Sequence, residues 1–347
     1  MGKIRVIELF AGYGSQHLAL KRLKRDFPQF EYEVIAFCEI DKYAIKAYRA
    51  LHGHNVPNIG DITKVSPLCI PNCDLMTWSF PCQSISCSGL QHGLAEGSGT
   101  HSSLCWDAIR IFKAKRPQYL LMENVSALVS NKFIKDFNMI QFSLQKLGYT
   151  NFVQLMNAKD YGVPQSRRRV FMVSILNCSH AYYFPEKKSL TCCMKDVLEK
   201  DVAEKYYLSD ERATNLIQKI VLHDVTEPSI IQIGNIKDDS QRQFKNPQDG
   251  RVFSSNGLSP TINTCQGGQR VPIIVEGVRL RYLTEREIFR LMDVDEYDIN
   301  TLLNAGISKT QLVKLAGNSI VVACMYYIFH ALFIKTMPVA GSQLQLF

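Results

Sequence analysis

The first half of the chain alternates between two patterns of apolar and polar residues. Short apolar runs, typical of buried strands, recur between longer segments whose apolar positions repeat every three to four residues, as in amphipathic helices. Strands are predicted over residues 3–9, 33–38, 74–77, 119–122 and 169–175. Helices are predicted over residues 15–25, 44–51, 106–115 and 133–147. This alternation predicts an α/β fold with a doubly wound, mostly parallel sheet covered by helices on both faces.

The pattern changes near residue 184. Beyond it, the region 228–280 holds only short β-like runs between clusters of Gly, Asn, Pro and Gln, and these runs cover residues 230–233, 252–253 and 273–275. Such frequent turn-forming residues indicate a small, irregular, mainly β insertion. We therefore expect a first domain over residues 1–183 and a smaller one over residues 184–280.

Helical patterns return in the last part of the chain. Thr284 and Glu287 have the spacing of a capping box, which marks the start of a helix. A final helix is predicted over residues 319–335, and its apolar composition suits packing against the main sheet. We expect residues 281–347 to return to the first domain.

Composition narrows the class of protein. Of the 347 residues, 46% are apolar and 21% charged, which excludes a disordered or collagen-like chain. The longest apolar run, residues 320–334, contains His330 and is shorter than the roughly 20 residues that span a bilayer. No signal-peptide pattern is present at the N-terminus. The 11 cysteines form no Cys-x-x-Cys pair or Cys/His cluster, so we expect reduced thiols in the cytoplasm and no structural metal.

The net charge of +8 is concentrated in the first half of the chain. Residues 1–183 hold 21 Lys and Arg against 13 Asp and Glu, whereas the counts are 13 against 13 for residues 184–280 and 6 against 6 for residues 281–347. A basic surface suits a polyanion such as nucleic acid, because neutralised phosphates release counterions. A basic domain without such a partner remains the alternative.

A glycine turn follows the first predicted strand. The order of strand, glycine turn and helix is typical of the beginning of a nucleotide-binding domain, and the turn here is Ala11-Gly12-Tyr13-Gly14. However, His17 replaces the third glycine of a dinucleotide fingerprint. Glu39, at the end of the second strand, is placed to accept hydrogen bonds from ribose hydroxyls, and Asp61 to accept one from an adenine amino group. For either acid the alternative is a helix cap or turn carboxylate.

A cysteine follows the third predicted strand directly, in Ser79-Phe80-Pro81-Cys82-Gln83. Ligands of open α/β sheets bind beyond the carboxyl ends of the strands, so Cys82 is predicted to face that crevice. Pro81 fixes the approach of the chain, and the glycines that follow predict a loop able to close over a substrate. The alternative is a buried, inert cysteine.

Two further segments carry charged groups to the same edge. Glu123 ends the fourth strand, where partial burial would raise its pKa and let it share a proton near neutral pH. Alternation along the strand that contains the arginine triplet puts Arg167 and Arg169 on one face and Arg168 on the other. The alternatives are a strand-end cap for Glu123 and a solvated surface for the arginines.

Together these segments resemble, in order, the motifs of the C5-cytosine DNA methyltransferases. The resemblance covers residues 4–335. The matching segments are Phe10-Ala11-Gly12-Tyr13-Gly14, Pro81-Cys82-Gln83, Glu123-Asn124-Val125, Gln165-x-Arg167-x-Arg169, Arg281-x-Leu283-Thr284-x-Arg286-Glu287 and Gly317-Asn318-Ser319. The resemblance implies a catalytic domain of the class I S-adenosylmethionine methyltransferase type, with a target-recognition domain inserted before the C-terminal helices.

The resemblance also implies roles for individual residues. S-adenosylmethionine would be the cofactor, and the residues expected to bind it are Phe10, Gly12, Gly14, Glu39, Ile40, Asp61, Ile62, Asn318 and Ser319. The Cys82 thiolate would add to C6 of cytosine while Glu123 holds a proton on N3. A free thiol has a pKa of about 8.5, so Cys82 needs a positive environment, for which Arg167 is the first candidate and Arg169 the second.

Attack at C6 comes perpendicular to the ring, so the target base must leave the DNA stack. Ser88, in the loop after Cys82, is a candidate to fill the gap. Candidate DNA-contacting residues are Gln165, Gln241, Arg242, Gln243, Thr261, Gln266, Gln269 and Arg270; glutamine pairs with adenine and arginine with guanine in the major groove. Thr261-Ile262 resembles the Thr-hydrophobic element of the family's recognition region.

The expected function is sequence-specific methylation of duplex DNA by a bacterial or phage enzyme, either an orphan or part of a restriction-modification system. No membrane and no obligate protein partner is implied, and we expect a monomer. The competing predictions are a tRNA cytosine methyltransferase, a non-catalytic DNA-binding regulator on the same scaffold, and a nicotinamide dehydrogenase. The sizeable region between Ile175 and Arg281 favours DNA over tRNA, intact Cys82 and Glu123 argue against the regulator, and the missing third glycine argues against the dehydrogenase.

Overall fold

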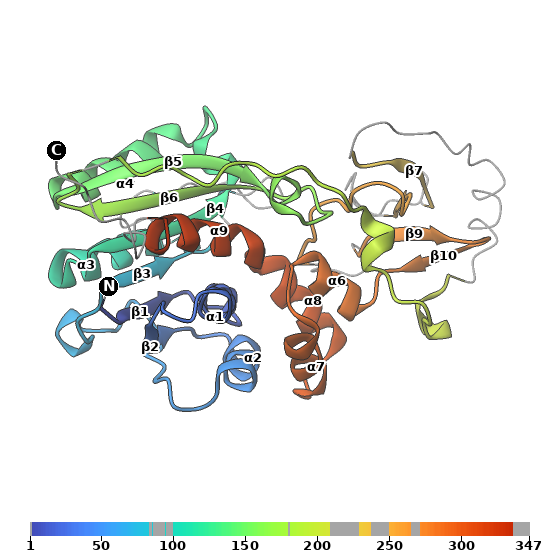
Figure 1. Ribbon diagram of the computed structural model, residues 1–347, viewed down its shortest axis with the longest axis horizontal. Helices are drawn as coiled ribbons and strands as arrows, with labels where there is room; N and C mark the ends of the chain where they lie inside the picture. The colour runs from blue at the N-terminus through green and yellow to red at the C-terminus, as the bar shows by residue number, and fades with distance from the viewer. Residues whose placement is uncertain are drawn as a thin grey trace, which may run out of the picture.

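A computed structural model describes residues 2–82, 85, 94, 100–179, 181–208, 229–236, 250–264 and 271–335. Its larger sheet has six strands in the order β2-β1-β3-β4-β6-β5 (Figure 1). The strands are β1 (Ile4–Leu9), β2 (Tyr32–Cys38), β3 (Leu75–Trp78), β4 (Tyr119–Val125), β5 (Tyr149–Asn157) and β6 (Arg168–Leu176). Only β6 runs opposite to its neighbours β4 and β5, which confirms a mostly parallel sheet.

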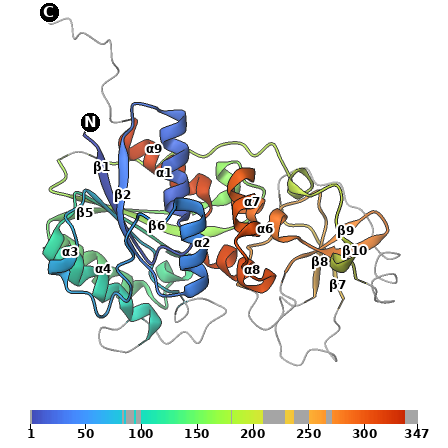
Figure 2. The ribbon, with the colours of Figure 1, turned by 90° about the horizontal axis from the view of Figure 1, so that it is seen from below.

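Helices cover both faces of this sheet. α1 (Ser15–Asp26) and α9 (Val322–Phe333) lie on one side, and α3 (Cys105–Lys115) and α4 (Ile134–Lys146) lie on the other (Figure 2). Side chains alternate between the two cores: Val6 of β1 packs with α1 and α9, whereas Ile7 and Leu9 pack with α3 and α4. α2 (Lys42–His52) covers the β2 end of the sheet and contributes Ala44 and Ala47 to the first core.

The predicted elements of this domain match the observed ones to within three residues at each end, but two differences matter for the site and the sheet. β4 continues through Glu123 and Asn124, whose polar side chains are buried rather than beyond the strand. β5 is not predicted, because it is the outer strand of the sheet and mixes buried and exposed positions without regular alternation. Its partner β6, buried over most of its length, has the continuous apolar run that a sequence pattern reveals.

A second, four-stranded sheet has the order β10-β9-β8-β7. Its strands are β7 (Gln232–Asn235), β8 (Arg251–Phe253), β9 (Ile273–Glu276) and β10 (Arg279–Tyr282). The three short β-like runs of the sequence thus become β7, β8 and β9, as predicted for a small β region. β10 forms a hairpin with β9 and crosses the domain boundary predicted at residue 280.

Three helices lie between the two sheets in Figure 1: α6 (Glu285–Leu291), α7 (Glu296–Asn304) and α8 (Lys309–Asn318). The predicted capping box is present, since the Thr284 hydroxyl accepts from Glu287 N (3.2 Å) and the Glu287 carboxylate accepts from Thr284 N (2.8 Å). Arg281 is fully buried between Glu276 of β9 and Glu287 of α6. This ion network fixes the small sheet to α6.

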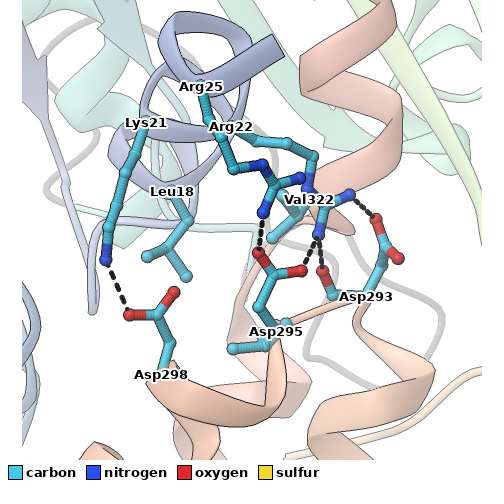
Figure 3. Close-up of a pocket in the computed structure, with 9 residues that line it drawn as sticks. Leu18, Lys21, Arg22, Arg25, Asp293, Asp295, Asp298 and Val322 are labelled. Atoms are coloured by element: carbon cyan, nitrogen blue, oxygen red, sulfur yellow. Dashed lines mark hydrogen bonds and ion pairs between the residues drawn. The ribbon is translucent and has the colours of Figure 1, made fainter.

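Charged pairs also attach α1 to the segment around α7, along the wall of a small cavity (Figure 3). Lys21 pairs with Asp298 (2.9 Å), Arg25 pairs with Asp295 (2.9 Å), and Arg22 contacts both Asp293 and Asp295. No predicted site residue is among those that line this cavity in the described part of the chain. The pairs therefore join the C-terminal segment to the first domain.

The stretch Lys309–Phe333, which comprises α8 and α9, has the length and hydropathy of a membrane span. However, 72% of its most apolar window is buried inside the protein. Because α9 packs on α1 and the sheet through residues such as Ile328 and Phe329, we interpret the stretch as core. Short 3₁₀ helices complete the described structure, at Pro67–Cys69, His101–Leu104, Ser126–Val129, Ala158–Tyr161, Met194–Val197 and Glu204–Tyr206.

Candidate active site

The predicted catalytic residues meet at one edge of the large sheet. The parallel strands β1 to β4 end there, and the reversed strand β6 begins there, so that Arg169 of β6 lies opposite Val125 of β4. Cys82 follows β3 on the same edge. The topology therefore brings together Cys82, Glu123 and the arginines, which lie far apart in the sequence.

Glu123 is 8% exposed, and Nε of Arg169 lies 3.2 Å from its Oε1. Burial raises the pKa of Glu123, while the positive charges of Arg169 and Arg167 and a hydrogen bond from Ser79 oppose this rise. The raised pKa agrees with the prediction for an acid at this strand end. A carboxyl group in this environment is suited to share a proton with a ligand.

The turn that carries Cys82 is fixed by side chains from other elements. Asn124 Nδ2 donates to Phe80 O (3.1 Å), and Ser102 Oγ donates to Pro81 O (2.8 Å). Burial raises the pKa of the Cys82 thiol; the positive charge of Arg169 lowers it, the carboxylate of Glu123 raises it, and the positive charge of Arg167 lowers it less than that of Arg169 does. Arg169, rather than Arg167, is therefore the stronger source of positive charge, which reverses the order predicted from the sequence.

Arg167 is 3% exposed, and backbone oxygens hold its guanidinium. It donates to Ile262 O (2.9 Å), Gly317 O (2.8 Å) and Ser319 O (2.6 Å). Burial lowers its pKa to about 9. Arg168 is exposed, which confirms the predicted alternation of the arginine triplet.

The glycine turn after β1 is closed on one side and open on the other. Phe10, Gly12 and Gly14 all have positive φ, at 56°, 59° and 81°. A Cβ on Gly14 would lie 2.5 Å from Nε2 of His52, whereas a Cβ on Gly12 would meet nothing within 4 Å. The side of the turn at Gly12 thus leaves room for a ligand to approach the backbone.

The carboxylate of Glu39 lies next to this open side. It accepts from the backbone N–H groups of Gly12 (2.9 Å), Ile40 (2.7 Å) and Asp41 (2.8 Å). The Ile40 side chain is 70% exposed, so an apolar surface is available beside the carboxylate. Asn58, which the sequence analysis missed, bonds to both N and O of Glu39 and so fixes the end of β2.

The remaining predicted cofactor residues lie in two other segments, the one after Asn58 and the end of α8. Asp61 accepts from N and Oγ1 of Thr63, and these hydrogen bonds lower its pKa. Ile62 is buried. At the end of α8, Asn318 is exposed and Ser319 lies beside the Tyr13 hydroxyl of the glycine turn.

The DNA-contacting candidates have different outcomes. Gln165 is 0% exposed and bonds to Ile262 N (3.0 Å) and Leu291 O (2.6 Å), so its side chain does not face the surface in this structure, and its contact with DNA stays a prediction. The Thr261 hydroxyl donates to Ser166 O (2.7 Å). The other candidates lie outside the described residues, namely Ser88, Gln241, Arg242, Gln243, Gln266, Gln269 and Arg270.

Known proteins of one family match the chain over nearly its whole length. A family model described as C-5 cytosine-specific DNA methylase matches residues 4–333. The type II methyltransferase M2.ScrFI of Lactococcus lactis subsp. cremoris is 33% identical over 95% of this chain and 99% of its own. The orphan methyltransferase M.SssI of Spiroplasma monobiae is 30% identical, over 92% of this chain and 94% of its own. The type II methyltransferase M.HhaI of Haemophilus parahaemolyticus is also 30% identical, over 94% and 93%.

Solved structures share the fold at lower identity. The Dnmt2 methyltransferase of S. pombe superposes with a TM-score of 0.69 at 19% identity, over 96% of this chain and 99% of its own. The methyltransferase EhMeth of Entamoeba histolytica superposes with a TM-score of 0.70 at 17% identity, over 97% and 100%. With the family model spanning nearly the whole sequence, the chain belongs to the C5-cytosine-specific DNA methylases and is a DNA cytosine-5 methyltransferase.

Proposed function

We propose that this enzyme transfers a methyl group from S-adenosylmethionine to C5 of a flipped-out cytosine in a specific duplex DNA sequence. The observation that carries the proposal is the convergence of Cys82, Glu123 and Arg169 beside the open glycine turn. A thiol, a carboxyl of raised pKa and a guanidinium are the groups that this reaction needs.

Cys82 is the proposed nucleophile. C5 of cytosine is a poor nucleophile, so the ring must first be activated. The thiolate adds to C6 while Glu123 holds a proton on N3, which removes the aromaticity and places electron density on C5. After methylation, loss of the C5 proton and expulsion of Cys82 restore the ring and the thiolate. Every bond made to the enzyme is thus broken again within the cycle.

Protonation of Glu123 and ionisation of Cys82 favour each other. The carboxylate of Glu123 raises the pKa of the Cys82 thiol. When Glu123 holds a proton that it shares with the base, this repulsion disappears and the thiolate forms more readily. Arg169 contacts Glu123 and lowers the pKa of Cys82, so a single cation serves both groups.

The cofactor residues fit S-adenosylmethionine. The space beside Gly12 admits a ligand to the backbone, Glu39 retains lone pairs for ribose hydroxyls, and the exposed Ile40 offers an apolar surface to adenine. Asp61, Asn318 and Ser319 border this space in the proposal. The cofactor supplies, when bound, the electrophilic methyl group that the activated base takes up.

The proposed substrate is duplex DNA, and the small β region with its neighbouring segments would read the sequence. Several relatives are named type II or orphan methyltransferases, which supports a role in restriction-modification or as an orphan enzyme in bacteria or phage. Duplex DNA and tRNA, offered as methyl acceptors with tritiated S-adenosylmethionine, separate this proposal from tRNA methylation.

A covalent adduct tests the mechanism. DNA that carries 5-fluorocytosine cannot lose a proton from C5, so the enzyme would remain bound through Cys82 in the presence of S-adenosylmethionine. We expect an adduct that survives denaturation and maps to the Cys82 peptide. The target site is found beforehand by bisulfite sequencing of DNA from cells that express the gene. Absence of the adduct with an active enzyme would contradict covalent catalysis by Cys82.

A further inference from the structure

The segment that leads into β6 is joined by a series of hydrogen bonds to residues 259–262, which lie between β8 and β9 of the small β region. Ser166 N donates to Ser259 O (2.9 Å), and Ser259 N donates to Pro164 O (2.9 Å). The Thr261 hydroxyl adds a third bond, to Ser166 O (2.7 Å). Residues 164–167 and 259–262 therefore behave as one ladder, although about 95 positions separate them in the sequence.

Two buried side chains extend this ladder in opposite directions. Gln165 accepts from Ile262 N and donates to Leu291 O at the end of α6. Arg167 donates to Ile262 O and also to Gly317 O and Ser319 O at the end of α8. Both side chains thus hold the backbone of Ile262 and connect it to the helices of the C-terminal segment. We call this pair the Gln165–Arg167 clamp.

A close backbone contact shows that the clamp leaves little freedom. A Cβ on Gly317 would lie 2.4 Å from the carbonyl carbon of Asn263, so α8 and the β region touch through their backbones at this point. Glycine at position 317 permits this approach, and the carbonyl that it presents is one of the acceptors for Arg167. Displacement of residues 262–263 would therefore move the partners of Arg167.

The clamp lies next to the reacting groups. Arg169 follows Arg167 on the same face and contacts Glu123. Asn157, at the end of β5, accepts from Arg167 N (2.9 Å) and so holds this backbone in line with the sheet. A shift in the segment 164–167 would consequently change where Arg169 meets Glu123.

From these contacts we propose that Gln165 and Arg167 are positioning residues that couple target recognition to the chemical step. The proposal rests on the proposed DNA methyltransferase function. The β region, when seated on its target sequence, would hold Ile262 in the position that aligns Arg169 with Glu123. An incorrect sequence would leave Ile262 displaced, and methylation would be slow even where the DNA is bound.

The buried cation supports this role for Arg167. Arginine presents five donors in a rigid fork, which suits three carbonyls arranged around one side chain, whereas lysine has a single ammonium group. The Arg167→Lys substitution therefore keeps the positive charge and disrupts the clamp. Arg168→Lys makes the same change at the exposed neighbour and serves as the matched control.

The experiment compares single-turnover methylation of two duplexes: the mapped target site, and the same site with one base pair changed outside the target cytosine. We expect Arg167→Lys to reduce the ratio of the two rates, the discrimination at the chemical step, by about 2- to 30-fold. The discrimination in DNA binding, measured by titration of both duplexes, should change much less. Arg168→Lys should retain the wild-type rate ratio.

Other results would overturn the inference. If Arg167→Lys slows methylation of both duplexes by the same factor, then Arg167 supports the chemical step independently of the DNA sequence, and the coupling is rejected. If the variant does not fold, as judged by its melting temperature, Thr261→Val removes one bond of the ladder, and an unchanged rate ratio in that variant would also reject the coupling. A wild-type enzyme that methylates no duplex would instead refute the proposed function.

Discussion

We call the part of the sheet edge formed by β1 and β2 the β1–β2 half, and the part formed by β4 and β6 the β4–β6 half. Each half holds a carboxylate, but the surroundings of the two carboxylates differ. Glu39 is surrounded by three backbone N–H groups, which belong to the glycine turn and to the start of α2. Glu123 has one guanidinium at 3.2 Å, and burial raises its pKa. In the β1–β2 half, backbone groups hold the carboxylate in place. In the β4–β6 half, the carboxyl group can gain or lose a proton beside a guanidinium.

This difference predicts how each half responds to substitution. In the β4–β6 half, removing one side chain should abolish or slow chemistry while the fold and binding persist. In the β1–β2 half, side chains contribute less than backbone conformation, so the sensitive positions are glycines, and the effects should fall on binding and stability.

The largest expected effect is that of Cys82→Ser. Serine keeps the shape of the turn but is a far weaker nucleophile, so turnover should fall by more than about 10⁴-fold. Cofactor and DNA affinities should stay near those of the wild type. Tritiated methyl transfer and equilibrium binding give the two quantities. Cys69→Ser, at an exposed cysteine, is the control; near-normal transfer by Cys82→Ser would require another nucleophile.

Glu123→Gln should have the next largest effect. The amide cannot carry the shared proton, and it leaves Arg169 without its carboxylate partner. We expect a loss of about 10² to 10⁴ in the single-turnover rate, the usual contribution of acid-base catalysis. Glu33→Gln, at an exposed position of β2, should leave the rate unchanged. An unchanged rate in Glu123→Gln would remove this residue from the mechanism.

Two glycine substitutions test the β1–β2 half. Alanine at Gly14 would collide with His52 and adopt an unfavourable positive φ, so the melting temperature should fall, with a loss of about 1–3 kcal/mol. Alanine at Gly12 also adopts a positive φ, but it meets no protein atom and enters the space proposed for the cofactor. We therefore expect Gly12→Ala to lower S-adenosylmethionine affinity, measured by calorimetry, more than it lowers the melting temperature. If the two substitutions lowered the melting temperature and the S-adenosylmethionine affinity by equal amounts, the distinction between a closed side at Gly14 and an open side at Gly12 would be contradicted.

The sequence predicted one kind of feature and missed another, for a physical reason. Cys82, Glu123 and Arg169 could be placed together because each adjoins a strand with a clear apolar pattern, and strand ends meet at one edge of a sheet. The environment of Gln165 could not be predicted, since its partners lie 97 and 126 residues away. A polar residue next to a run of arginines is expected to be exposed until those partners are known.

The same reasoning explains the reversed order of the two arginines. Spacing put Arg167 and Arg169 on one face of the strand, and the exposed Arg168 confirms this. Which of them dominates the charge at Cys82 depends on where each guanidinium finds acceptors. Arg167 finds carbonyls of Ile262, Gly317 and Ser319, and Arg169 finds Glu123. None of these tertiary contacts follows from local pattern.

The smallest expected effect concerns stability and a buried acid beneath the glycine turn. Glu8 is fully buried, and burial raises its pKa to about 7, while a hydrogen bond from the Tyr48 hydroxyl (2.5 Å) opposes the rise. Between its ordinary pKa of 4.5 and about 7, the folded protein keeps a proton that the unfolded chain has lost. The contribution of Glu8 to stability therefore decreases as pH rises through this window, and it levels off above it.

Glu8→Gln removes this titration, so the variant should become more stable relative to the wild type as pH rises. We expect the difference in unfolding free energy between the two proteins to grow by up to about 1.4 kcal/mol per pH unit between pH 5 and 7, because one proton is involved. Urea unfolding at pH 5, 6, 7 and 8 measures it. His17 and His52, stacked beside Tyr48, have pKa values lowered chiefly by burial and are present in both proteins, so their contribution largely cancels. A constant difference across these pH values would show that Glu8 is ionised in the folded protein, and the β1–β2 half would then hold a buried charge as the β4–β6 half does.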